Sequence, residues 1–241
     1  LASEQLDGQL SVFTGGFRES QRYDESRYAK LMAEHVGAAY YEVFPTAQDL
    51  ADSFSDMVYY LDEPVAGAAV FPQYFLSRLA SQHVKVVLGG QGGDELFCGY
   101  TRYLLAYLER SLGETIHGAQ AGEPGAALDD LVPNLTHLRG WEPTLQRFMS
   151  TDLFGAAADR YYLLLQRSDD VGQIVAADTG AGDYSPRDAF REDFERPQTD
   201  ALIDRMAYID LKRHLQSLLH LEDRTSMAVS LSPTTDQTDA T

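Results

Sequence analysis

The residues best suited to chemistry lie in one stretch of seven, Gly89 to Glu95. Four of the first five are glycines, which accept positive φ and expose N–H groups that can hold an anion such as a phosphate. Asp94 and Glu95 follow at once and supply the hard oxygen ligands that Mg²⁺ takes. The stretch therefore predicts a loop that binds a phosphate together with its Mg²⁺.

A structural alternative for the same stretch is a glycine-rich turn whose acids only favour the positive N-terminus of a helix expected at 96–112. The glycines alone do not separate these two interpretations. The preceding residues, 84–88, are apolar and rich in β-branched types, which predicts a buried strand of a parallel sheet. Because open α/β sheets bind ligands at the carboxyl ends of their strands, this position favours the binding loop.

The elements before this strand alternate in type. Strands are expected at 10–13 and 40–44, and helices at 26–36, 47–61 and 71–81, after the tail of an earlier helix at 1–6. Such alternation is typical of an α/β protein in which right-handed crossovers join parallel strands.

After Tyr100 the pattern becomes helical. Apolar residues recur at helical spacing within 103–112, 145–153, 161–165 and 201–220, whereas the Gly-, Asp- and Pro-rich segments 113–134 and 168–197 are expected to be loops. We predict three regions: a partial nucleotide-binding α/β core at 1–112, a helical part at 113–231, and a tail at 232–241. The tail has no basic residue and few apolar ones, which favours disorder or a foreign origin.

Composition limits the classes of partner. The chain has 241 residues, with 19 Lys and Arg against 37 Asp and Glu, and its net charge of −18 disfavours binding to nucleic acid. The single cysteine, Cys98, excludes an internal disulfide, fits a reducing cytoplasm and is expected to be a small packed residue. Neither a run of 18 apolar residues nor a signal-peptide pattern is present, so we expect no membrane partner and a cytoplasmic protein.

Four segments, in order, resemble one family. Residues 86–100, V-V-L-G-G-Q-G-G-D-E-L-F-C-G-Y, resemble the S-G-x-G-x-D-E-x-F-x-G-Y signature of the asparagine synthetase family, in its C-terminal, ATP-consuming domain. The other three segments are 10–29, similar to T-F-S-x-G-F followed by D-E-x-x-Y-A; 61–74, similar to the D-E-P segment and its helix; and 210–228, similar to D-L and L-L-x-x-D-R-x-S-M-A. Together they cover most of residues 10–231, and their order makes the resemblance specific.

The resemblance implies a fold and a reaction. The fold is an α/β parallel sheet of the adenine-nucleotide alpha-hydrolase type, incomplete at its N-terminus, followed by a helical region. In the family, ATP adenylates the side-chain carboxylate of aspartate, Mg-pyrophosphate leaves, and ammonia displaces AMP to give asparagine. The implied cofactors are ATP and Mg²⁺. The implied substrates are aspartate or another carboxylate, with ammonia from glutamine, and the full-length protein is compatible with a homodimer.

The resemblance also assigns ligand residues. Those expected to contact ATP or the adenylate are glycines, and those expected to hold Mg-pyrophosphate are acids: Gly15, Gly89, Gly90 and Gly92, with Asp94 and Glu95. Gly15 borders the adenine, although the family has a β-branched residue there, which puts a packing contact with the base in doubt.

Asp223 and Arg224 are predicted catalytic residues at a second wall of the site, just after the last helix. Arg224 can pair with a carboxylate or phosphate through its planar guanidinium. Without the resemblance, Asp223 and Arg224 would be interpreted as a solvated surface pair.

Gln91 is the third predicted catalytic position. Asparagine-forming members usually carry Glu there, and a Gln side chain cannot accept a proton at neutral pH. Three interpretations stay open: the proton acceptor lies elsewhere and the substrate differs, the second half-reaction is lost, or ammonia gives its proton to water or phosphate.

The sequence also departs from the family pattern. The S-G-G-x-D-S pyrophosphate loop, the glutaminase domain with its N-terminal cysteine, and the late lysine are not found in these residues. We therefore expect a fragment that is inactive alone. The alternatives to asparagine formation are a β-lactam-forming or peptide-cyclising relative, and an inactive truncated copy that binds only a nucleotide or a partner.

Overall fold

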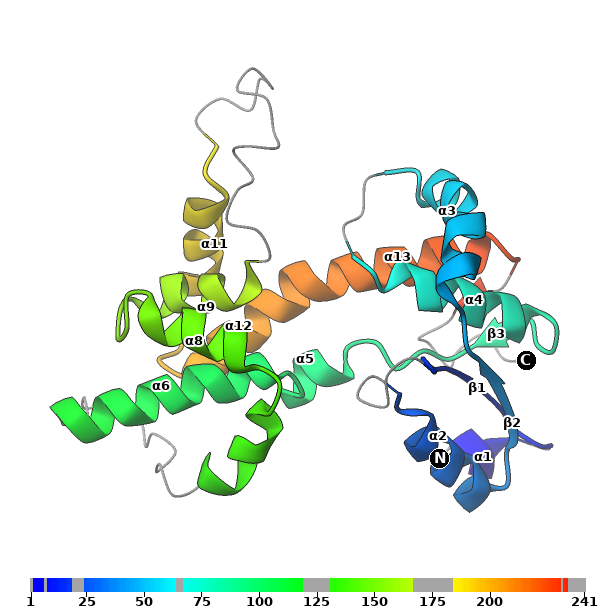
Figure 1. Cartoon of the computed structure of the whole chain (residues 1–241), viewed down its shortest axis with the longest axis horizontal. Helices are drawn as coiled ribbons and strands as arrows, with labels where there is room; N and C mark the ends of the chain where they lie inside the picture. Colours follow the sequence, from blue (N-terminus) through cyan, green and yellow to red (C-terminus); the bar gives the residue numbers. More distant parts are fainter. Residues whose placement is uncertain are drawn as a thin grey trace. The chain divides into compact units, whose positions relative to one another are not determined.

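The computed structural model describes residues 2–6, 8–18, 24–63, 67–118, 131–166, 184–230 and 232–233. The chain forms two compact units, labelled in Figure 1 by their elements. Unit 1 comprises residues 1–91 and 216–241, and unit 2 comprises residues 92–215. This division is spatial, whereas the predicted regions 1–112, 113–231 and 232–241 follow chain order. It falls inside the glycine-rich stretch, between Gln91 and Gly92.

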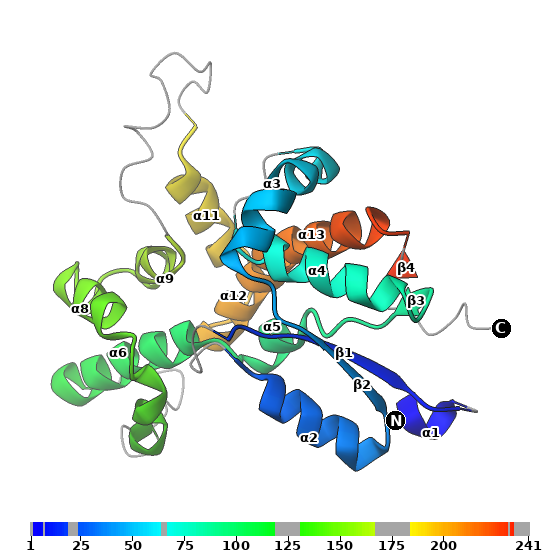
Figure 2. The same cartoon turned by 45° about the vertical axis from the view of Figure 1, so that its right-hand side comes forward.

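A parallel pair of strands forms the main sheet of unit 1. β1 (Ser11–Gly15) pairs along its length with β2 (Ala39–Val43), and α2 (Ser26–Val36) connects them. α2 and α4 (Val70–Ser81) both pack against the pair, and Figure 2 shows them on opposite sides of it. The predicted strand–helix–strand unit is therefore confirmed. The predicted helix tail at 1–6 is the short α1 (Ala2–Gln5).

Local sequence signals explain why α3 (Ala47–Leu61) has the predicted bounds. Thr46 accepts a hydrogen bond from the Asp49 N–H, and the Asp49 carboxylate accepts one from the Thr46 N–H, which forms a capping box. Its buried residues repeat every four positions, so one face of α3 packs on α4. These residues are Ser53, Met57 and Leu61.

The strand before the glycines differs from the prediction. β3 has only two residues, Val86–Val87, and pairs in parallel with β4 (Ser232–Pro233) in a sheet separate from β1 and β2. The side chain of Val86 is 53% exposed, so the predicted buried strand at 84–88 is wrong in length and in burial. The pairing of β3 with β4 covers two residues of each strand. Pro233 has no backbone N–H to donate, which limits the hydrogen bonds that β4 can make.

The tail prediction is also corrected at β4. Residues 232 and 233 form a strand instead of a disordered tail. Residues 234–241 lie outside the described residues.

Unit 2 begins with two helices where one was predicted. α5 (Gly93–Phe97) ends at Cys98, whose φ of 58° is left-handed, and Tyr100 is extended before α6 (Thr101–His117) begins. The helix predicted at 96–112 is therefore interrupted. α6 also extends into the predicted loop at 113–134, of which residues 119–130 lie outside the described residues.

The remaining elements of unit 2 are helical. They are η1 (Val132–Leu138), α8 (Glu142–Ser150), α9 (Ala157–Leu165), α11 (Pro186–Glu195) and α12 (Leu202–Ile209). α11 corrects the loop predicted at 168–197. Ser185 caps it by accepting from the Asp188 N–H, and Pro186 fits its first turn, whereas residues 167–183 lie outside the described residues.

Two apolar cores hold unit 2 together. One is built on Tyr161, Phe194 and Met206, and the other on Leu105 and Phe148. Tyr161, Met206 and Phe148 lie at apolar positions that the sequence predicted at helical spacing, whereas Phe194 lies in the segment 168–197 that was predicted to be a loop.

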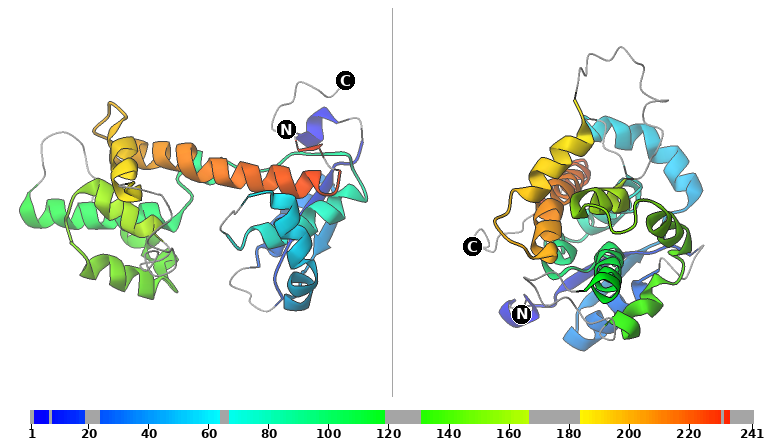
Figure 3. Two further views of the ribbon diagram at one scale, coloured as in Figure 1. Left: turned by 90° about the horizontal axis from the view of Figure 1, so that it is seen from above. Right: turned by 90° about the vertical axis from the view of Figure 1, so that its left-hand side faces the viewer.

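The last helix is longer than predicted. α12 continues through a π-helical turn, η2 (Asp210–His214), into α13 (Leu215–Met227), and Figure 3 shows them as one continuous helix. Residues 222–224 therefore lie within α13. The sequence had predicted that Asp223 and Arg224 come just after the helix. In the part of the chain that the structure describes, no helix has the length and apolar character needed to cross a membrane.

Candidate active site

The glycine loop begins where β3 ends. Gly89 and Gly90 are both exposed, and a Cβ placed at Gly90 would meet no atom within 4 Å. A Cβ placed at Gly89 would overlap Oε1 of Glu222 and lie 3.1 Å from its Oε2. A side chain at residue 89 would therefore have to displace the carboxylate of Glu222, which is the flexible end of its side chain.

Gly92 needs its glycine for a different reason. Its φ of 94° lies in the left-handed region, and it is buried in unit 2 against the side chain of Leu215. Gln91, the predicted catalytic position between the two glycine pairs, is exposed in unit 1.

Glu222 is a site residue that the sequence analysis missed. It lies on α13 and is 7% exposed, and its carboxylate has no hydrogen bond or ion pair to any residue that the structure describes. Burial raises its pKa above the ordinary range of a glutamate. The one sequence signal for Glu222 was its position directly before Asp223-Arg224. That signal could not identify it, because a solvated glutamate at a helix end would look the same in the sequence.

Of the two predicted catalytic residues on α13, Asp223 and Arg224, only Arg224 has a clear side-chain partner among the described residues. Its Nη1 lies 2.9 Å from Oδ2 of Asp62, and its Nε is buried without a hydrogen-bond partner. One turn earlier, His220 Nε2 lies 3.3 Å from Oε1 of Glu63, an ion pair only when His220 is protonated. Asp223 is exposed. The structure thus brings two of the sequence motifs together, the D-E-P segment and the D-R run.

Gly15 ends β1, which belongs to the other sheet of unit 1. A Cβ placed there would meet no atom within 4 Å, so open space surrounds it. Next to it, the Gly16 N–H donates to the carbonyl of Val43, 3.0 Å away, which continues the pairing of β1 with β2.

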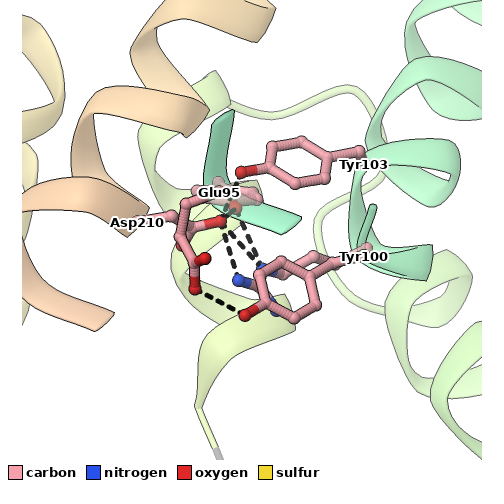
Figure 4. Close-up of polar contacts among 6 residues, drawn as sticks. Glu95, Tyr100, Tyr103 and Asp210 are labelled. Atoms are coloured by element: carbon pink, nitrogen blue, oxygen red, sulfur yellow. Dashed lines mark hydrogen bonds and ion pairs between the residues drawn. The ribbon is translucent and has the colours of Figure 1, made fainter. Parts of the chain in front are cut away.

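The two acids of the motif lie in different environments within unit 2. Asp94 is exposed, with its carboxylate against the backbone of Gly99. Glu95 is buried, and Oε1 accepts a hydrogen bond of 2.5 Å from the Tyr100 hydroxyl (Figure 4). This bond and burial both raise the pKa of Tyr100, with burial the larger cause. Asp94 is thus free to meet a ligand, whereas Glu95 has a structural partner.

A second buried carboxylate, Asp210, organises the helices of unit 2. Its Oδ2 accepts from Arg102 Nη2 at 2.7 Å, from the Tyr103 hydroxyl at 2.6 Å and from the Tyr161 hydroxyl at 2.7 Å. Figure 4 shows Asp210 and Tyr103 pointing toward each other beside the Glu95–Tyr100 pair. The guanidinium of Arg102 stacks 3.6 Å from the ring centre of Tyr100 and so joins the two pairs.

This network is the second feature that sequence analysis missed. Asp210 belongs to a D-L pair that carried the resemblance, but nothing in the sequence showed which residues it would contact. Among the described residues, no group of three or more His, Cys, Asp or Glu side chains is arranged to hold a metal ion.

Parallel strands joined by a helix, with a glycine loop after a strand, define an α/β protein of the adenine-nucleotide alpha-hydrolase type. The family is identified by comparison: the asparagine synthase family model matches residues 1–235, so the chain belongs to this family. The match thus extends into the first residues of the predicted tail at 232–241.

Curated relatives agree with this family. The chain is 38% identical over 130 residues to a putative glutamine-hydrolysing asparagine synthetase of Mycobacterium bovis, which covers 49% of this chain and 20% of the relative. It is 35% identical over 94 residues to asparagine synthetase 1 of Bacillus subtilis, covering 39% of this chain and 15% of the relative. The asparagine synthetase B of Escherichia coli is 32% identical over 109 residues, covering 44% and 19%. The matches thus span a fifth or less of each relative's length. No solved structure matches the chain.

Proposed function

We propose that this chain carries the ATP-dependent synthetase site of an enzyme that forms an amide from a carboxylate and ammonia, with aspartate as the carboxylate. The observation that supports this most is the family match over residues 1–235, in which the glycine loop follows a parallel strand. The names of the relatives supply aspartate's product and glutamine as the ammonia source.

The glycine loop is suited to bind the adenylate. Gly89 and Gly90 offer backbone N–H groups without side chains, and the exposed surface at Gly90 leaves room for a ligand. Backbone donors of this kind are fixed before the reaction, so they can stabilise the charge that develops on a phosphate without reorganising.

The charged residues divide the remaining roles. Asp94, an exposed carboxylate, fits a ligand of Mg²⁺, which when bound offsets the negative charge of pyrophosphate. Arg224 pairs with Asp62 through Nη1 while its side chain is 39% exposed, so the guanidinium can also meet a carboxylate or phosphate.

The test is to incubate the full-length gene product with ATP, Mg²⁺, aspartate and ammonia. We expect asparagine, AMP and pyrophosphate in equal amounts. The isolated 241-residue chain should give no ATP–pyrophosphate exchange above a no-enzyme control, because the phosphate loop and lysine of the family are not among its residues. Release of ADP and phosphate by the gene product, or exchange by the isolated chain, would contradict this account.

A second candidate, amide formation on another carboxylate, is favoured by Gln91. The comparison is product formation from aspartate by the parent and by Gln91→Glu, with a panel of other carboxylates in parallel. If the parent makes asparagine as fast as Gln91→Glu, this residue does not mark another substrate. If neither protein makes AMP with any carboxylate, the inactive copy is the better description. We place the protein in the cytoplasm, in accord with its single cysteine.

A further inference from the structure

Gly99 is a glycine that its own backbone angle does not explain. It follows Cys98, which ends α5 in the left-handed region with a φ of 58°. Helices that end in this way usually carry glycine at the left-handed residue itself, because glycine has no side chain to strain there. Gly99 comes one residue later, and its φ lies outside that region. The glycine at residue 99 therefore needs another reason.

The reason lies in the space beside Gly99, which the side chain of Asp94 fills. A Cβ placed at Gly99 would overlap Oδ1 of Asp94 and lie 3.0 Å from its Cγ. The Gly99 N–H also donates to the backbone carbonyl of Asp94, 2.9 Å away. Both residues lie in unit 2. Residue 99 thus holds the main chain of Asp94 by a hydrogen bond and leaves room for its carboxylate.

The Asp94 carboxylate depends on this space for its direction. It is exposed, and among the residues that the structure describes no hydrogen bond or ion pair holds it. Mg²⁺ typically takes one or two protein carboxylates and completes its shell with water and phosphate oxygens, so one exposed carboxylate with a fixed direction suits it. A side chain at residue 99 would turn the carboxylate into another rotamer and away from that direction.

We propose that Gly99 is a positioning residue for Asp94, the proposed ligand of Mg-pyrophosphate, an inference that rests on the proposed function. Gly99 acts through Asp94 and not on the ligand itself. The atoms that an alanine at residue 99 would displace most belong to the end of a flexible side chain. The nearest backbone atom, Cα of Asp94, would lie 3.2 Å from the new Cβ, a contact that a small shift relieves. The change should therefore weaken the binding of Mg-pyrophosphate much more than it weakens the fold.

The experiment measures the affinity of the full-length gene product for Mg-pyrophosphate by calorimetry. We expect Gly99→Ala to lower this affinity about 10–100-fold, the usual cost of losing a residue that orients a metal ligand, and to change the melting temperature little. ATP–pyrophosphate exchange by Gly99→Ala should need a higher Mg²⁺ concentration and recover part of its rate in excess Mg²⁺. In the Asp94→Asn background, Gly99→Ala should lower the affinity no further, because the group through which it acts is already lost.

The matched control is Gly155→Ala, the same change at another glycine of unit 2. A Cβ there would likewise overlap an aspartate carboxylate, that of Asp152, which has no part in the proposed site. It would also lie 2.9 Å from the backbone carbonyl oxygen of Asp152. Gly155→Ala should therefore lower the melting temperature and leave the affinity for Mg-pyrophosphate and the Mg²⁺ requirement unchanged.

Several outcomes would overturn the role of Gly99. They are parent affinity in Gly99→Ala, an equal loss of affinity in Gly155→Ala, a further loss when Gly99→Ala is added to Asp94→Asn, and a Gly99→Ala protein that does not fold. A parent that neither binds Mg-pyrophosphate nor exchanges pyrophosphate would instead contradict the proposed function itself, and the inference with it.

Discussion

The two units treat their apolar and charged side chains differently. In unit 2 apolar side chains fill two cores, although Phe97 and Ile116 are exposed, and the buried carboxylates accept hydrogen bonds. In unit 1 the outer faces of α2 and α3 expose large apolar side chains, and Glu222 is buried with no partner among the described residues. The exposed residues are Tyr28, Leu31, Met32, Phe54, Val58 and Tyr59. The difference lies in how the carboxylates are held: Glu109 and one oxygen of Asp210 are fixed by cations and hydroxyl or backbone donors in unit 2, whereas Glu222 has no such partner among the described residues of unit 1.

The largest expected effect is the loss of Asp210. Its carboxylate is 0% exposed and accepts from Arg102, Tyr103 and Tyr161, so Asp210→Ala leaves the largely buried guanidinium of Arg102 uncompensated. We expect unit 2 to lose about 3–5 kcal/mol of unfolding free energy. Urea unfolding followed by Trp141 fluorescence checks this, because Trp141 is the only tryptophan and packs against a core of unit 2.

The control for Asp210 is the exposed ion pair of unit 1. Asp62→Ala removes a partner of Arg224, but the Asp62 side chain is 67% exposed, so we expect a loss of roughly 0–1 kcal/mol, followed by circular dichroism. Equal losses for the two variants would remove the distinction between the units.

A methionine in each unit sharpens the comparison of apolar packing. Met206 is 0% exposed and Met32 is 61% exposed. Met206→Ala should cost about 2–5 kcal/mol, because it leaves a cavity in the core. Met32→Ala should stay within about 0.5 kcal/mol, since no packed neighbour is lost. A costly Met32→Ala, measured by urea unfolding, would show that α2 packs its outer face in solution.

The smallest expected effect is the pH dependence of stability due to Glu222. Burial raises its pKa in the folded state, so the folded protein loses stability as the pH rises from the unfolded value, about 4.3, through the higher folded value. Glu222→Gln lacks this loss. We expect Glu222→Gln to melt at a higher temperature than the parent at neutral pH, and the difference to vanish below pH 4. A difference that is constant with pH would show that the carboxylate titrates normally.

Local signals predicted most of the fold of unit 1. The α2 bounds, the α3 bounds and the β1–β2 pair follow from apolar periodicity, from the Thr46 capping box and from glycine stops. The length of β3 could not be predicted, because an apolar run shows its tendency to form a strand but not the length of the strand that pairs with it. The continuation of the last helix to Met227 was missed because acidic and basic residues occur equally at helix ends and within helices.

The sequence named candidate site residues, which stay a prediction, but it could not show the environments in which they lie. Sequence placed Asp94 and Glu95 in one role because adjacent acids look alike, whereas the helix that carries them turns one outward and the other inward. Glu222 was not found because its burial depends on the contact of α13 with Gly89, a contact across more than 100 residues of chain.

The most direct test uses these adjacent acids in the full-length gene product. Asp94→Asn should abolish most ATP–pyrophosphate exchange and leave the melting temperature nearly unchanged, because an exposed ligand is lost without a buried bond. Glu95→Ala should lower the unfolding free energy by about 1.5–3 kcal/mol through loss of the hydrogen bond from Tyr100, while the molecules still folded should retain exchange. Exchange by Asp94→Asn within a few-fold of the parent would contradict the account, because the exposed acid of the glycine loop would then have no part in the reaction.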